Sequence, residues 1–167
     1  DDAYAYVGMG FAQHRTNPEA AVDAFEEALS INPNLAIAHF GMSVALVSAR
    51  QPDRAISHLQ IAFRLSPRDP LTDAYHRVMA TAFFLKGEYD LVIEWSSKAR
   101  TIKTLYGRTG AVRVAAFAHL GRDSDMERES ARLLEAVPHF SISLALNASP
   151  ELGDPYAEGL RKAGFKD

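Results

Sequence analysis

The chain has 167 residues, the size of one ordinary domain, and its 47% hydrophobic and 23% charged residues exclude disordered and collagen-like classes. The lack of cysteine excludes disulfide frameworks, thiolate metal sites and cysteine nucleophiles, and it suits a reducing, cytoplasmic setting. A net charge of −3 argues against a domain that binds DNA or RNA through phosphate contacts.

Helix-breaking residues recur along the chain at a spacing of 34. Three pairs share this spacing: Pro18 and Pro52, Pro33 and Pro67, and Gly87 and Gly121. Pro67 and Pro138 are two periods plus three residues apart, which places an insertion near residues 68–70. A period of this length is typical of stacked helical hairpins.

The first two predicted hairpins span about residues 3–33 and 36–67. Asn17-Pro18 is an N-cap followed by proline at the first helical position, so it predicts the start of a second helix. Val22, Phe25 and Leu29 then follow at helical spacing. The uncharged stretch 28–49 is interrupted by Pro33, and the 15 residues left rise only about 22 Å, so they predict a buried helix rather than a membrane span.

The last two predicted hairpins span about residues 73–104 and 107–138, with their second helices ending near Thr104 and Pro138. Gly87 and Gly121 stand where a helix must stop and the chain reverse. The best strand-like alternation, 140–144, is short and flanked by helix, so we expect it to be helical. The predicted fold class is all-α, with repeats over 1–139 and a C-terminal helical cap over 140–167.

The residues within the period resemble those of the tetratricopeptide repeat (TPR). Ala21, Phe25 and Pro33 match the second-helix pattern of alanine, aromatic and closing proline, and Ala55, Leu59 and Pro67 nearly match it. First-helix slots for large, apolar, small and large side chains hold His39, Met42, Ser43 and Leu46, then His76, Met79, Ala80 and Phe83. The match decays toward the C-terminus, where Arg113 occupies an apolar slot and Met126 replaces alanine. The resemblance covers about residues 3–139 and implies a right-handed superhelical solenoid of about four hairpins.

Two short strings resemble a particular setting of such repeats. Residues 65–70 and 158–164 are similar to the C-terminal TPR region of bacterial class III adenylate cyclases, and regions of this type also follow winged-helix domains in bacterial regulators. The chain begins Asp1-Asp2 without a leader, which predicts that it is a piece of a longer protein. The catalytic residues of a cyclase parent would lie outside this chain.

The sequence predicts no enzyme activity, no cofactor and no metal site in this domain. None of the six histidines has metal-ligand spacing, and no phosphate-binding loop or nucleophile elbow is present. We expect His39 and His76 to pack in the core and His14 and His119 to cap helix ends. The charge runs 26–27 and 127–129 predict solvated faces. A basic cluster at Arg100, Lys103, Arg108 and Arg113 is the only hint of nucleic-acid binding, which we do not expect.

The remaining role is binding by shape, because first helices of stacked hairpins line a concave groove. Counting along each first helix predicts these groove residues: Tyr6, Gly10, Gln13, Phe40, Val44, Val47, Arg77, Thr81, Phe84, Arg108, Ala111 and Ala115. Packing against the next repeat is the competing interpretation for each of them. Arg77 and Arg108 have no acidic neighbour among these positions, which predicts a partner with acidic character.

The sequence therefore predicts a protein–protein interaction module of a larger bacterial signalling protein, which binds a partner peptide or domain in its groove. One alternative is a self-association module that sets the oligomeric state of its parent. Another is a small-molecule sensor that uses the apolar groove as a pocket. The expected location is cytoplasmic.

Overall fold

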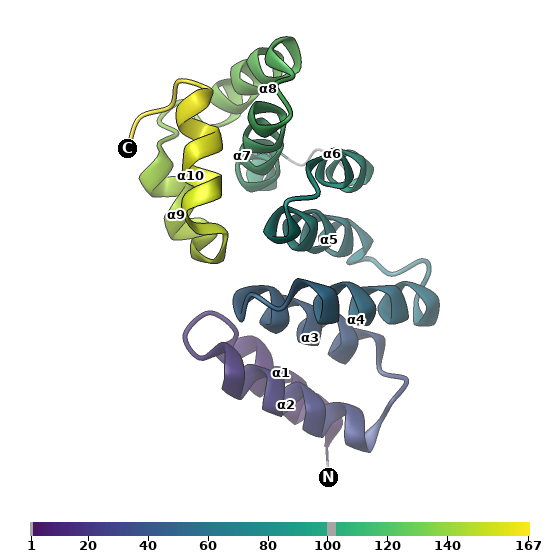
Figure 1. Ribbon diagram of the computed structural model, residues 1–167. Coiled ribbons are helices and arrows are strands. Elements are labelled where there is room, and N and C mark those ends of the chain that lie inside the picture. The colour runs from purple at the N-terminus through teal and green to yellow at the C-terminus, as the bar shows by residue number, and fades with distance from the viewer. Residues whose placement is uncertain (1, 100–102) are drawn as a thin grey trace. The chain divides into compact units, whose positions relative to one another are not determined.

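The computed structural model describes residues 2–99 and 103–167, with the backbone only for 103–106 (Figure 1). The described residues form ten α-helices and no strand, which confirms the predicted all-α class. The helices group into two compact units, residues 1–82 and 83–167, and the boundary falls within one helix, α5.

The first unit contains two helical hairpins and most of a fifth helix. The helices are α1 (Ala3–Gln13), α2 (Pro18–Ile31), α3 (Ala36–Ser48), α4 (Pro52–Leu65) and α5 (Thr72–Lys86), of which the part up to Ala82 belongs to this unit. The second unit continues with α6 (Tyr89–Lys98), α7 (Lys103–His119), α8 (Asp123–Ala136), α9 (Ile142–Ala148), the 3₁₀ helix η1 (Pro150–Leu152) and α10 (Gly153–Lys162).

Local sequence signals set the helix ends largely as predicted. Asn17 accepts a hydrogen bond from the Ala20 amide and Pro18 opens α2, so this N-cap is confirmed. Gly87 and Gly121 have φ values of 73° and 65°, a left-handed conformation that glycine adopts without steric cost. Arg50 takes the same conformation, with φ 57°, at the turn between α3 and α4.

Two predicted boundaries differ from the structure. Helix α6 ends at Lys98, and Thr104 lies in α7, so the third hairpin does not extend to residue 104. No proline stands there to mark the end. Asp69-Pro70 has the same N-cap and proline pattern as Asn17-Pro18, which predicts a helix start. It does not open α5, because Asp69 Oδ1 instead accepts the Leu71 amide in a turn and the helix begins at Thr72.

A buried phenylalanine joins the first three helices. Phe25 of α2 is fully buried, and a Cβ added at Gly10 of α1 or Gly41 of α3 would lie 2.6 Å or 2.2 Å from its ring. The Phe11 ring meets the Phe25 ring edge-on, with centroids 5.2 Å apart. Glycine is therefore needed on both neighbouring helices, because any side chain would occupy the space of the ring.

Aromatic rings also connect the first helices of successive hairpins. Phe11 of α1 lies 6.2 Å from Phe40 of α3, and Phe40 lies 4.7 Å from Tyr75 of α5, measured between ring centroids. Phe63 of α4 meets Tyr75 edge-on at 5.3 Å. Within residues 1–82, each first helix therefore contacts the next one.

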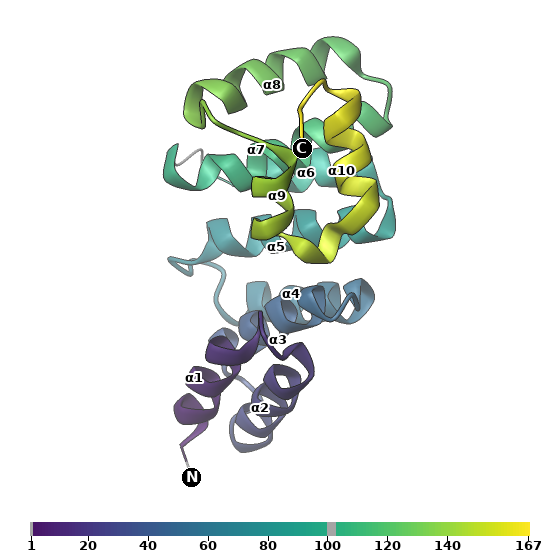
Figure 2. The same cartoon turned by 90° about the vertical axis from the view of Figure 1, so that its left-hand side faces the viewer.

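The C-terminal segment packs onto α7 within the second unit (Figures 1 and 2). A Cβ added at Gly159 of α10 would lie 2.8 Å from backbone atoms of Ala115, so the two helices cross closely. Tyr156 and Leu160 are buried beside this crossing. The chain end folds back, since the Ile142 amide donates to the Lys166 carbonyl at 2.9 Å. The predicted segment 140–144 is helical only from Ile142 onward.

The Phe25 contact predicts a contrast between two glycines of α1. Gly10→Ala should lower the free energy of unfolding by about 1–3 kcal/mol, because the Phe25 ring must move. Gly8→Ala should raise it by up to about 1 kcal/mol, because a Cβ there meets nothing within 4 Å and alanine favours the helix. Denaturant unfolding of both variants measures this difference. Equal stabilities would contradict the packing around Phe25.

The α7–α10 crossing predicts that Gly159→Val destabilises the second unit by about 1–3 kcal/mol, because the new side chain strikes the Ala115 backbone. Glu158→Ala, at the exposed neighbouring position of α10, is the control and should change stability little. Thermal unfolding followed by circular dichroism compares the two variants. A Gly159→Val protein as stable as the control would rule out the close crossing.

Candidate interaction surface

The predicted groove residues of the first unit divide into core and surface positions. Gly10, Phe40 and Val47 are buried, Gly10 against Phe25 and Phe40 between Phe11 and Tyr75. For these three residues, the structure agrees with the competing interpretation that they pack within the protein. The others are partly exposed: Tyr6 and Gln13 on α1, Val44 on α3, and Arg77 and Thr81 on α5. These five lie on the three first helices that follow one another in this unit.

The predicted groove residues of the second unit are largely covered by the chain itself. Phe84, Ala111 and Ala115 are buried. Tyr156 of α10 meets Phe84 edge-on at 5.7 Å, and Gly159 lies against Ala115. Arg108 is exposed. The C-terminal segment therefore occupies part of the face that the sequence analysis assigned to a partner.

The two arginines that suggested an acidic partner already have interactions. Arg108 donates from Nη2 to Ser149 Oγ at 3.2 Å. Arg77 is likewise engaged within the protein. Because both guanidinium groups are engaged within the protein, the predicted acidic character of a partner loses this support.

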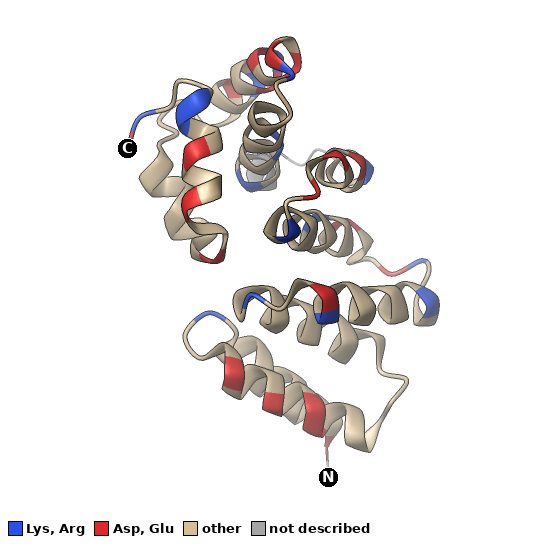
Figure 3. Ribbon diagram, viewed as in Figure 1, with Lys and Arg blue, Asp and Glu red and all other residues tan. Residues whose placement is uncertain are grey.

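Helix α1 exposes a face without charge. Its residues from Ala3 to Gln13 include no charged side chain (Figure 3). The large exposed side chains of this face are Tyr4, 65% exposed, and Met9, 51% exposed, and the small Ala5, Gly8 and Ala12 lie between them. Exposed faces of surface helices normally carry charged residues. We call Tyr4, Ala5, Gly8, Met9 and Ala12 the α1 face.

Helix α2 differs from α1 in its exposed residues. Glu19, Asp23, Glu26 and Glu27 are exposed, and α2 contains no basic residue (Figure 3). Glu26 pairs with Arg54 of α4 at 3.3 Å. The predicted solvated face at 26–27 is confirmed. Such exposed ion pairs contribute little to stability.

The histidines make structural contacts. His39 is buried as predicted, and the His76 ring stacks on Phe63 with centroids 5.4 Å apart. His14 Nδ1 lies 2.8 Å from the Phe11 carbonyl near the end of α1, as expected for a cap. His119 differs, because its Nε2 meets the Pro155 carbonyl at the start of α10, and its ring stacks on Tyr89 at 4.5 Å. It therefore ties α7 to the C-terminal segment rather than capping its own helix.

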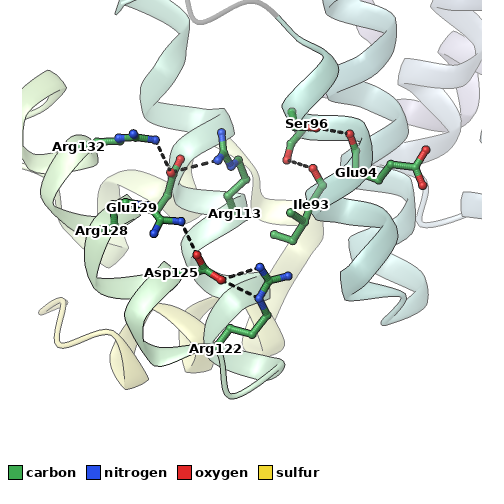
Figure 4. A network of polar contacts seen from close by, with 10 residues as sticks. Ile93, Glu94, Ser96, Arg113, Arg122, Asp125, Arg128, Glu129 and Arg132 are labelled. Carbon is green, nitrogen blue, oxygen red and sulfur yellow. Dashed lines mark hydrogen bonds and ion pairs between the residues drawn. The ribbon is translucent and has the colours of Figure 1, made fainter.

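A buried ion pair crosses the α7–α8 hairpin (Figure 4). Glu129 of α8 is only 2% exposed, and its Oε2 lies 3.2 Å from Arg113 Nη2 of α7. The more exposed Arg132 approaches the same oxygen at 3.7 Å. The prediction of a solvated face at 127–129 is thus wrong for Glu129. The arginine in an apolar slot of α7 and the buried glutamate of α8 compensate each other.

A second carboxylate on α8 lies nearer the surface. Asp125 pairs with Arg122 and Arg128, and the Arg122 guanidinium holds the pKa of this carboxyl below its usual range (Figure 4). Of the predicted basic cluster, Arg100 and the Lys103 side chain lie outside the described residues, and Arg113 is neutralised by Glu129.

Comparison with known proteins does not identify a family. No protein-family model matches the sequence, and a search of curated proteins finds no match. Within the described residues, no three His, Asp or Glu side chains converge in a way that would hold a metal ion. None of the described helices combines the length and apolar character needed to cross a bilayer.

The buried ion pair predicts strongly non-additive mutations. Arg113→Met should lower the free energy of unfolding by about 2–4 kcal/mol, because the buried Glu129 carboxylate then loses the guanidinium of α7 that lies 3.2 Å from it. The double variant Arg113→Met with Glu129→Met should recover much of this loss, because no buried charge remains. Denaturant unfolding of both single variants and the double variant forms the cycle. Additive losses would show that the two residues do not interact.

Proposed function

We propose that this chain is a protein–protein interaction module built from TPR-like helical hairpins. Its all-α hairpins and the contacts between successive first helices in residues 1–82 support this proposal. Ala21, Phe25, Ala55 and Leu59, which carry the resemblance to the TPR pattern, are all fully buried, and this also supports the proposal. Right-handed superhelical stacking of about four hairpins is part of the proposal.

The observation that carries the proposal is the α1 face. Tyr4 and Met9 are exposed on a helix without charge. Tyrosine and methionine are enriched at protein interfaces, where they supply apolar contact area, whereas charged residues are depleted from interface centres. A protein partner with an apolar, uncharged helix face would bury both side chains. The partly exposed Tyr6 and Gln13 on the same helix supply polar groups beside them.

The partly exposed groove positions of the first unit form a second region for the partner. Val44 offers apolar contact, and Gln13 and Thr81 offer hydrogen-bonding groups. A bound peptide that uses this region would be held by apolar contact and neutral hydrogen bonds rather than by free cations. The apolar-pocket sensor remains an alternative use of the same region.

Self-association is the second candidate function, and the α1 face favours it specifically. The whole chain carries a net charge of −3, so most pairings of two copies bring like charges together. The α1 face has no charge to repel an identical face, and Ala5, Gly8 and Ala12 allow a second helix to approach closely. A parent such as a bacterial adenylate cyclase or winged-helix regulator, located in the cytoplasm, would use either kind of association for signalling.

The proposal predicts that charges on the α1 face weaken association. The double variant Tyr4→Glu with Met9→Glu should weaken binding about tenfold or more, because two carboxylates would be desolvated at the contact. Helicity should not change, since both positions are exposed. Ser57→Glu with Gln60→Glu, at exposed positions of α4, is the control with the same added charge.

Two measurements separate the candidates. Sedimentation of the full chain over a concentration series tests self-association. The self-association proposal is wrong if the unmutated chain stays monomeric at high micromolar concentration. Quantitative capture from a bacterial lysate, followed by titration with the purified partner, tests binding to another protein. Val44→Arg then reports on the groove region. A partner that binds the α1-face variant, Val44→Arg and the control equally would contradict the proposed surfaces.

A further inference from the structure

Two imidazole rings meet between α3 and α4 in the first unit. His39 Nδ1 of α3 lies 2.9 Å from His58 Nδ1 of α4. The other ring nitrogen of His39, Nε2, lies 3.0 Å from the Pro33 carbonyl in the turn between α2 and α3. His39 is 7% exposed, whereas His58 is half-buried. The pair therefore connects the α3–α4 hairpin to the preceding turn.

The geometry limits how many protons the pair can hold. A carbonyl oxygen only accepts, so His39 Nε2 carries a proton. Only one proton fits between the two Nδ1 atoms, and when both rings are neutral His58 Nδ1 donates it to His39 Nδ1, because His39 already carries its proton on Nε2. The pair keeps both contacts when it carries two ring protons, in which case both rings are neutral. It also keeps them when it carries three ring protons, in which case one ring is charged. A fourth proton would point two N–H donors at each other and break the Nδ1 contact.

The charged groups around the pair oppose the fourth proton. Arg54, one turn before His58 on α4, is a cation that acts on the His58 ring. From α2, the Glu26 carboxylate faces α4 but pairs with Arg54 at 3.3 Å. From α5, His76 stacks on Phe63 of α4. Burial, His39 and Arg54 together lower the pKa of His58 to about 4.

We propose that His39 and His58 form a pH-sensitive latch that holds α3, α4 and the Pro33 turn together at neutral pH and opens when both rings are protonated. The latch is a property of the first unit whether or not the chain binds a partner. Opening removes the Nδ1–Nδ1 hydrogen bond between the two helices and leaves both rings charged near Arg54. Acidification would then loosen the hairpin that carries Val44 and Phe40.

The direction of the pH effect follows from proton binding. In the unfolded chain, His58 takes up a proton near pH 6.5. In the folded protein it takes up that proton only near pH 4. Between these values the unfolded state binds more protons, so stability is complete above about pH 6.5 and falls as the pH drops toward 4.

An NMR titration of the full chain tests the latch directly. The His58 ring signals, assigned by their loss in His58→Gln, should titrate near pH 4. Amide exchange across residues 33–46 and 55–62, corrected for its intrinsic pH dependence, should accelerate at the same pH. A His58 ring that titrates between pH 6 and 7 would overturn the proposal.

Thermal unfolding supplies the comparison between variants. His58→Gln keeps a hydrogen-bonding group beside His39 but cannot be protonated. When the pH is lowered from 7 to 4.5, its Tm should therefore decrease less than the Tm of the unmutated protein, by about 4 °C. His139→Gln, at an exposed position outside the helices, is the control and should follow the parent. Identical pH dependence of Tm in His58→Gln and His139→Gln would also overturn the latch.

Discussion

The close approach of helices around Phe25 is the constraint on which the first unit depends. A ring from α2 fills the space that side chains at Gly10 and Gly41 would otherwise take, so α1 and α3 both come within contact of the same side chain. The edge-on contact with Phe11 then fixes the ring, and Phe11 in turn reaches Phe40. The first unit thus needs one large and two small residues at three positions far apart in sequence, which local helix propensity does not supply.

In the second unit, the helices are held together by other contacts than an aromatic ring against two glycines. Its α7–α8 hairpin buries a glutamate against an arginine, and its α7–α10 contact depends on Gly159 against a backbone. A buried ion pair adds little net stability compared with apolar packing, but removal of one partner is costly. Arg113, which departs from the repeat pattern in α7, is therefore accommodated by its ion pair with Glu129 of α8.

Residue spacing is sufficient to predict the helical hairpins, but it does not predict which residues pack against other helices. Prolines, glycines and the Asn17 cap act locally, so they indicate where helices begin and reverse. The charge pattern predicts an exposed Glu129, because the partner that buries it lies on another helix. The repeat spacing misplaces the end of α6 at Thr104, because no proline marks where this helix ends. Arg50 adopts a glycine-like conformation that residue type does not signal. Half of the predicted groove residues are buried, because counting along a helix cannot show which face a neighbour covers.

The two features on which the proposals rest lie where the chain departs from ordinary packing. On the uncharged α1 face, Tyr4 and Met9 are exposed to water, although burial of each side chain would be favourable by about 1.5 kcal/mol or more. The contact between the buried His39 ring and the half-buried His58 ring makes the α3–α4 packing sensitive to proton concentration. Both features belong to residues 1–82, and neither is needed for the Phe25 packing that holds this unit together. Because the Phe25 contact involves no titratable group, acidification can weaken the histidine pair while the helices of the first unit remain in contact.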